Sequence, residues 1–150
     1  MGHKAGVLGR DISYSLSPQI QKLFARAADI EIDYKIYDIE GDPITFIYDF
    51  FKKGGIGLNI TKPYKEIVAQ EFSKNLDSVN CLYGNEINAT STDGSGFIAD
   101  INSKGISIED KNVLLFGLGG AGKSILKELK LAKKIYIANR TKNKVELAIQ

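Results

Sequence analysis

The apolar residues of this chain fall in short continuous runs and in sets spaced three or four positions apart. The run at residues 113–116 leads directly into a glycine-rich turn and then into a helical pattern. A continuous run of this length is typical of a strand in a parallel sheet, because helices cover both faces of such a sheet. We therefore predict a buried parallel strand over residues 113–116, followed by a helix.

The same reasoning predicts the remaining elements. Short apolar runs predict strands at 5–8, 34–37, 58–60 and 135–138. Helical spacing predicts helices that open at Ser17, Pro43 and Pro63, one through Phe97 and Ile101, and another from about Lys142. Residues 79–83 and 86–90 flank Gly84 and Asn85, which predicts a hairpin with a two-residue type II′ turn.

This order of elements predicts an α/β fold with two domains. An N-terminal αβ domain covers residues 1–103, and the first part of a Rossmann-type, doubly wound parallel sheet covers residues 104–150. A complete dinucleotide domain has two βαβαβ halves, and this chain ends inside the helix predicted from about Lys142. We therefore expect a fragment of a longer protein, and the sequence leaves open whether the fragment itself is active.

Composition narrows the class of protein. The chain has 150 residues, of which 43% are apolar and 25% charged, and its formal net charge is +2. This balance is typical of a soluble globular protein and favours neither nucleic acid nor a membrane as partner. The single cysteine, Cys81, excludes an intramolecular disulfide, and we expect a cytoplasmic protein.

Histidine usage excludes several chemistries. The only histidine is His3, next to the N-terminus. Ser-His-Asp triads, histidine-based metal sites and imidazole acid–base catalysis are therefore not expected. We predict no metal site, and any proton transfer must use Lys, Asp, Glu, Tyr or Cys.

The glycine-rich turn is a predicted phosphate site. Gly117, Gly119 and Gly122 have the spacing G-x-G-x-x-G, in which glycine lets the backbone approach a phosphate beside a helix N-terminus. Residues 117–124 also satisfy the P-loop pattern G-x-x-x-x-G-K-[ST], where Lys123 would reach the outer phosphates and Ser124 would hold magnesium. The turn alone does not choose between a dinucleotide and a nucleoside triphosphate.

The next strand favours a dinucleotide. It ends in Asn139, Arg140 and Thr141, about twenty residues beyond the glycines, where a dinucleotide site holds the adenosine ribose. A basic residue at this point binds a 2′-phosphate, whereas an acidic residue binds a free 2′-hydroxyl. Because Arg140 is basic and Lys142 and Lys144 follow it, we favour NADP over ATP.

Four residues of the first domain and its boundary are further candidates. Ser15 and Ser17 beside a helix N-terminus would suit a carboxylate, although a turn serine and an N-cap before Pro18 explain them equally well. Lys65 lies in the first turn of a predicted helix, where the dipole disfavours a cation, so it is a functional candidate besides being a possible surface lysine. Asp93 is either an N-cap or a functional carboxylate.

Taken together, these segments resemble the shikimate dehydrogenase family. The family's S-x-S-P lies at 15–18 and its N-[VI]-T-x-P-[FY]-K at 59–65, while V-N-T-L is similar to 79–82 and N-T-D-G to 91–94. Its phosphate turn G-A-G-G-A is similar to 117–121, and N-R-T is intact at 139–141. The resemblance implies a substrate-binding domain followed by an NADP-binding domain, and the NADPH-dependent reduction of 3-dehydroshikimate to shikimate in aromatic amino acid biosynthesis.

The resemblance also implies roles for individual residues. The substrate carboxylate would be bound by Ser15 and Ser17, and its hydroxyls by Thr61, Asn80 and Asp93. The catalytic pair would be Lys65 and Asp93. The cofactor would contact Gly117, Gly119, Gly120, Ala121, Gly122, Asn139, Arg140, Thr141 and Lys144. The expected partner is this small-molecule substrate, and the expected state is a monomer or homodimer.

The chain departs from the family pattern at three places. Family members often have Gly-Asn-Pro where this chain has residues 9–11, Cys81 replaces a threonine, and Ser91 replaces an asparagine. These changes bear on the details of the pocket. Three alternatives stay open: a related two-domain dehydrogenase of the quinate or methylenetetrahydrofolate type, a P-loop nucleotide-binding module, and a non-catalytic fragment that binds nothing tightly.

Overall fold

The structure is a computed structural model that describes residues 2–141, 143 and 145–146. The chain divides into two compact units, Met1–Thr90 and Ser91–Gln150. Among the described residues, no helix combines the length and the apolar character needed to cross a membrane.

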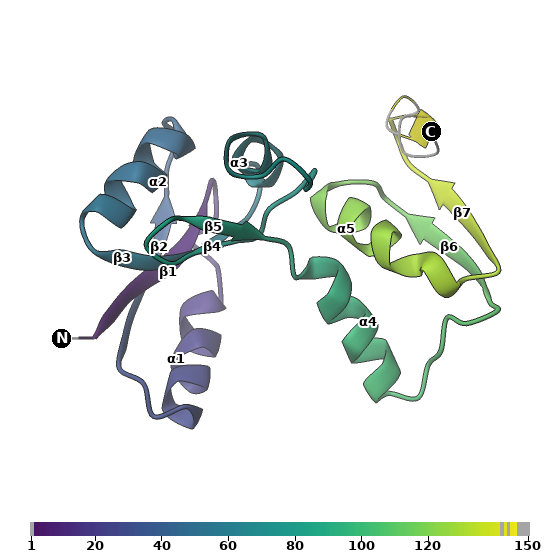
Figure 1. The fold of residues 1–150 in the computed structure, drawn as a ribbon, viewed down its shortest axis with the longest axis horizontal. Coiled ribbons are helices and arrows are strands. Elements are labelled where there is room, and N and C mark those ends of the chain that lie inside the picture. The colour runs from purple at the N-terminus through teal and green to yellow at the C-terminus, as the bar shows by residue number, and fades with distance from the viewer. Residues whose placement is uncertain (1, 142, 144, 147–150) are drawn as a thin grey trace. The chain divides into compact units, whose positions relative to one another are not determined.

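A five-stranded sheet forms the centre of the N-terminal unit, in the order β2-β1-β3-β4-β5 (Figure 1). The first three strands along the chain run parallel, and β4 and β5 join the sheet as an antiparallel hairpin. The strands are β1 (His3–Gly9), β2 (Ile32–Asp38), β3 (Gly55–Ile60), β4 (Cys81–Tyr83) and β5 (Asn88–Thr90). The predicted strands at 5–8, 34–37 and 58–60 are confirmed.

Three helices cover this sheet. Helix α1 (Ser17–Ala27) lies on one face, and α2 (Pro43–Lys52) and α3 (Lys65–Phe72) lie on the other (Figure 1). Helix α2 begins at Pro43 as predicted, because the Asp42 carboxylate accepts hydrogen bonds from the N–H groups of Ile44 and Thr45 at 3.2 and 3.0 Å. Helix α3 begins two residues after the predicted Pro63, since a turn in which Tyr64 N–H donates to the Thr61 carbonyl precedes it.

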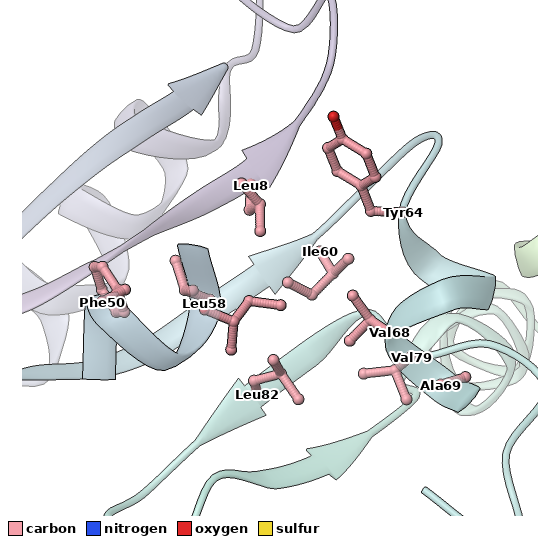
Figure 2. Close-up of a cluster of buried hydrophobic side chains, with 10 residues drawn as sticks. Leu8, Phe50, Leu58, Ile60, Tyr64, Val68, Ala69, Val79 and Leu82 are labelled. Carbon is pink, nitrogen blue, oxygen red and sulfur yellow. The ribbon is translucent and has the colours of Figure 1, made fainter. Parts of the chain in front are cut away.

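The main core lies between the sheet and helices α2 and α3 (Figure 2). Leu58 and Ile60 of β3 point into this core and are 1% and 2% exposed. Successive side chains of a strand point to opposite faces, so Asn59 lies on the α1 face of the sheet. A polar side chain is thereby placed in the middle of an apolar strand without entering the main core.

The apolar face of α1 is not buried as helical spacing suggests. Leu23 and Phe24 are 61% and 62% exposed, and Ala25 is the buried residue of the helix. Helix α1 thus contacts β1 and β2 with a small side chain as its one buried residue, whereas Leu23 and Phe24 are exposed.

The hairpin of β4 and β5 is present, but the predicted two-residue turn is wrong. Tyr83 pairs with Asn88, which leaves the four residues 84–87 in the loop. Gly84 and Ile87 both have positive φ, of 79° and 52°. Ile87 is partly buried and packs against the main core, and it lies outside the strand pairing.

The second unit contains a two-stranded parallel sheet, β6 (Asn112–Phe116) and β7 (Lys134–Ala138), as predicted. Helix α5 (Gly120–Glu128) and the short η1 (Leu129–Leu131) connect the strands, and α4 (Asp93–Ser103) packs on α5. Because α4 is grouped with this unit, the units divide after Thr90, and the domain boundary at residue 103 stays a prediction. Lys142 lies outside the described residues.

The predicted burial of the strand at 113–116 is wrong for the described chain. Leu114 and Phe116 of β6 are 67% and 86% exposed. Their apolar character indicates a sheet with two covered faces, but among the described residues α5 packs on only one face of the two strands.

Candidate active site

An open cavity of about 300 Å³ lies at the carboxyl end of the parallel strands in the N-terminal unit. Its lining comes from α1, the ends of β1 and β3, the start of α3 and the segment before β4: Val7, Ser17, Ile20, Gln21, Asn59, Ile60, Thr61, Lys65 and Asn80. Four of the predicted substrate-binding and catalytic residues, Ser17, Thr61, Lys65 and Asn80, therefore surround one cavity.

The parallel pairing of β1 and β3 explains why these residues meet. Leu8 pairs with Ile60, so the segments that follow the two strands leave the sheet at the same edge. Thr61 N–H donates to the Leu8 carbonyl at 2.9 Å and joins the two segments. The Asn80 carbonyl accepts a hydrogen bond from Ile60 N–H at 2.8 Å, which brings Asn80 to the same place.

The two serines at the start of α1 are in contact. Ser15 Oγ donates to Ser17 Oγ at 3.1 Å and accepts from Ser17 N–H at 3.3 Å. Ser17 is not the N-cap: Leu16 occupies that position without a side-chain cap, and Ser17 is the first helical residue. Ser17 thus lines the cavity and does not cap the helix, and a paired hydroxyl site beside a helix N-terminus suits a carboxylate.

Lys65 is the first residue of α3, as its predicted place in the first turn requires. Its backbone carbonyl accepts from the N–H of the fully buried Val79 at 3.0 Å. The backbone of Lys65 is thus fixed to the segment that carries Asn80, and its side chain lines the cavity beside Thr61.

Asp93 is the first residue of α4 and follows Thr92, which occupies the N-cap position. The interpretation of Asp93 as an N-cap is therefore wrong. Asp93 belongs to the second unit and Lys65 to the first, so their pairing stays a prediction.

The segment around Asp93 is tied to helix α5 within the second unit. The hydroxyls of Ser91 and Ser124 form a hydrogen bond of 2.5 Å. A Cβ atom at Gly94 would lie 2.3 Å from the Ser124 carbonyl oxygen, so the backbones of α4 and α5 approach closely here. Ser91, one of the three departures from the family pattern, thereby gains a partner on α5.

This close approach predicts a large effect of one added methyl group. We expect Gly94→Ala to lower the free energy of unfolding by about 1–3 kcal/mol, because a Cβ against a backbone carbonyl forces the helices apart. Gly96→Ala is the matched control, since a Cβ there meets nothing within 4 Å and alanine stabilises a helix by about 0.5–1 kcal/mol. Urea unfolding curves would compare them, and equal stability of the two variants would contradict this packing.

Each of the three glycines of the phosphate turn has a different structural role. Gly117 has a φ of 99°, a left-handed conformation that side chains disfavour. A Cβ at Gly119 would meet open space, so the backbone is accessible to a ligand, whereas a Cβ at Gly122 would lie 2.3 Å from the Gly117 carbonyl oxygen. A tight turn, an approachable backbone and close helix packing are the three roles of glycine in dinucleotide-binding turns.

The end of β7 is joined to this turn. Asn139 Oδ1 accepts from Leu118 N–H at 3.0 Å, and Asn139 Nδ2 donates to the Thr141 carbonyl at 2.9 Å. Arg140 and Thr141 follow on the exposed surface, and Lys144 lies outside the described residues. The predicted ribose site is thus held next to the predicted pyrophosphate site by one amide side chain.

Two polar residues of the cavity were not predicted from the sequence as site residues. Asn59 lines the cavity from β3, and Gln21 lines it from α1. A polar residue between apolar neighbours in a strand was the available signal for Asn59. Gln21 lies four residues after Ser17, a spacing that places both on the same helix face.

Cys81 lies opposite Asn59 in the pairing of β3 with β4 and is half-buried. Burial raises the pKa of its thiol, so the side chain is a neutral one at physiological pH. The departure from threonine at this position therefore adds no charge beside Asn80.

Comparisons with known proteins agree with this geometry. A family model described as the shikimate dehydrogenase substrate binding domain matches residues 7–82. The shikimate dehydrogenase (NADP(+)) of Idiomarina loihiensis is 36% identical over 154 residues, covering 95% of this chain and 55% of that protein. Its counterpart in Legionella pneumophila strain Corby is 39% identical over 160 residues, covering 97% of this chain and 59% of that protein.

A solved structure shows the same fold. The crystal structure of shikimate dehydrogenase 1 from Peptoclostridium difficile is similar with a TM-score of 0.85 and 28% identity, covering 94% of this chain and 56% of that one. The chain therefore spans a little more than half the length of the relatives it matches.

Proposed function

The chain belongs to the shikimate dehydrogenase family, and from this premise we propose that the protein catalyses the NADP-dependent reduction of 3-dehydroshikimate to shikimate. The observation that carries the proposal is the cavity in which Ser17, Thr61, Lys65 and Asn80 meet. Hydroxyl, amide and ammonium groups around one open space suit a small polyhydroxylated carboxylic acid better than an apolar ligand.

In this proposal the substrate is held by its polar groups. Ser15 and Ser17 bind the carboxylate at the N-terminus of α1, and their mutual hydrogen bond supports a joint role. Thr61, Asn80 and Asp93 bind the ring hydroxyls. With the ring held at both ends, the carbonyl is presented to Lys65.

The residues of the glycine turn fit a dinucleotide. The open space at Gly119 and the close packing at Gly122 support the binding of a pyrophosphate on Gly117, Gly119, Gly120, Ala121 and Gly122. Asn139 holds the turn, and Arg140, Thr141 and Lys144 bind the 2′-phosphate. When bound, NADPH supplies the hydride.

The protein residues supply the proton. Reduction of a ketone leaves negative charge on its oxygen, which a nearby proton donor stabilises. Lysine is protonated at neutral pH, so the Lys65 ammonium donates a proton to this oxygen and then regains one from solvent. The Asp93 carboxylate orients the ammonium and a substrate hydroxyl. The only histidine of the chain is His3, so in this proposal the pair of Lys65 and Asp93 carries out the proton transfer that a histidine performs in other enzymes.

Ligand binding and turnover test the proposal. Calorimetric titrations of the 150-residue chain with shikimate, quinate, NADPH, NADH and ATP would measure which ligands it prefers, and NADPH absorbance would report turnover of shikimate with NADP⁺. Preference for shikimate and NADPH is expected. Preference for quinate would indicate the related quinate dehydrogenase activity, and a chain that binds none of these ligands would contradict the proposal.

The proposal also covers the cellular location and the oligomeric state of the protein. We propose a cytoplasmic enzyme, which the single cysteine supports, and one that acts as a monomer or homodimer. Light scattering coupled to size-exclusion chromatography would measure the oligomeric state.

Substitution of Lys123 distinguishes the dinucleotide interpretation of the glycine turn from the P-loop interpretation. We expect Lys123→Ala to change NADPH affinity by less than about threefold, since in a dinucleotide site the backbone of the glycine turn holds the pyrophosphate. In a P-loop the same change would abolish ATP binding. The engagement of Ser124 with Ser91 supports the dinucleotide interpretation, because a P-loop serine holds magnesium. Tight, magnesium-dependent ATP binding would contradict it.

A further inference from the structure

A buried tyrosine contacts the wall of the cavity from two strands away. Tyr34 lies in the middle of β2 and is 6% exposed. Its hydroxyl donates a hydrogen bond of 2.7 Å to Oδ1 of Asn59, which lines the cavity. Strand β1 lies between β2 and β3, so this bond crosses a distance of about 10 Å between strand axes.

The sequence of β1 allows this crossing. Tyr34 pairs with Ala5, and Val7 pairs with Asn59, on the face of the sheet that α1 covers. A small residue beside Tyr34 leaves room for the aromatic ring to lie across β1. Ala5, Val7 and Tyr34 belong to one buried cluster, which holds the ring in place.

The surroundings of Asn59 decide which way its amide group points. Asn59 Nδ2 lies 3.5 Å from the Asn80 carbonyl, which can only accept a hydrogen bond. The NH₂ group must therefore face Asn80, and the carbonyl oxygen of the amide must face Tyr34. A tyrosine hydroxyl can donate to that oxygen, so both ends of the amide are satisfied in one orientation only.

This orientation gives the cavity wall a defined polarity. Asn59 Oδ1 accepts a hydrogen bond from Tyr34, and one hydrogen of the NH₂ group is directed at Asn80. The NH₂ group has a second hydrogen, which can be donated to a ligand in the cavity. The wall at Asn59 therefore offers a donor and favours an acceptor oxygen, such as that of a hydroxyl, carbonyl or carboxylate group.

We propose that Tyr34 is a positioning residue of the substrate cavity, which acts through Asn59 by holding its amide as a donor toward the ligand. The inference rests on the proposed function for the identity of the ligand. Burial raises the pKa of Tyr34 above its ordinary value, so its hydroxyl stays protonated and remains a donor to Asn59.

The test compares two tyrosines of the same strand in the 150-residue chain. Tyr34→Phe removes the hydroxyl that contacts Asn59. Tyr37→Phe is the matched control, because Tyr37 lies three residues further on and packs against Phe46 and Phe50 on the opposite face. We expect Tyr34→Phe to raise the Kd for shikimate about three- to tenfold, the worth of one hydrogen bond, and Tyr37→Phe to leave the Kd unchanged.

A double-mutant cycle distinguishes positioning from a general structural role. If Tyr34 acts through Asn59, Tyr34→Phe has no further effect on the Kd for shikimate in an Asn59→Ala background. The same loss of affinity in both backgrounds would overturn the proposal.

A readout without ligand separates this inference from the proposed function. NMR resonances of the Asn59 side-chain NH₂ should shift in Tyr34→Phe and stay in place in Tyr37→Phe. Unchanged Asn59 resonances in Tyr34→Phe would overturn the positioning role, whether or not shikimate binds. A wild-type chain that binds no shikimate, but in which these resonances shift as expected, would overturn the proposed function and retain the control of Asn59 by Tyr34.

Discussion

Replacing Lys65 with alanine is expected to lower the kcat for shikimate oxidation by about 10²–10⁴, which is the range for loss of a general acid–base group. In the proposed mechanism, Lys65 accepts the proton that leaves the substrate hydroxyl when the reaction runs in this direction. The KM for shikimate should change much less, since the serine pair and Asn80 still hold the ring. Steady-state kinetics with shikimate and NADP⁺ would separate the two constants.

Three further variants make this prediction specific. Lys74→Ala removes an exposed lysine just beyond helix α3 and should leave kcat unchanged. Asp93→Asn should impair both kcat and KM, because it disturbs Lys65 and a substrate hydroxyl together. Combining Lys65→Ala with Asp93→Asn should cost less than the sum of the separate effects, as expected for residues that act as a unit. Strict additivity, or normal turnover of Lys65→Ala, would show that Lys65 has no role in proton transfer.

Arg140→Ala should weaken NADPH binding by about ten- to a hundredfold while changing NADH binding little. The reason is a charge-assisted contact that only the 2′-phosphate of NADPH can make. Arg140 lies exposed directly after β7, next to the Asn139 amide that joins this strand to the phosphate turn. Fluorescence titrations with the two reduced cofactors would measure both affinities.

The control for Arg140 is a cation away from the predicted ribose site. Lys130→Ala removes an exposed lysine of η1 and should affect neither cofactor. Equal losses of NADPH and NADH affinity in Arg140→Ala would place Arg140 outside the 2′-phosphate site.

Local signals in the sequence were sufficient to predict most of the strands and helices. The apolar runs of β1, β2 and β3, and the Pro43 start of α2, follow from residues within a few positions of one another, and the structure confirms them. The glycine turn was also readable, because positive φ at Gly117 and close packing at Gly122 are requirements of the backbone that only glycine meets. These features depend on short-range sterics, which a single segment carries by itself.

Burial was less predictable than secondary structure. Leu23 and Phe24 of α1 and Phe116 of β6 have the apolar character of core residues, but they are exposed. Ile87 was expected in a strand and instead leaves it to pack on the core. A pattern of apolar residues indicates that a face can be buried, whereas the packing of other elements decides whether it is.

In the candidate cavity, too, some features could be predicted from the sequence and others are decided by the tertiary structure. Ser17 and Lys65 were recognisable from local sequence, because a hydroxyl beside a helix start suits a carboxylate and a lysine at a helix start is disfavoured by the helix dipole. The hydrogen bond between Tyr34 and Asn59 could not be predicted from the sequence, since it joins two strands that are separated in the sheet by a third. Its physical cause is the order and register of the strands, with Ala5 opposite Tyr34 and Val7 opposite Asn59. Chain periodicity assigns each side chain to a face of its own strand, and only the assembled sheet decides which residue it meets across that face.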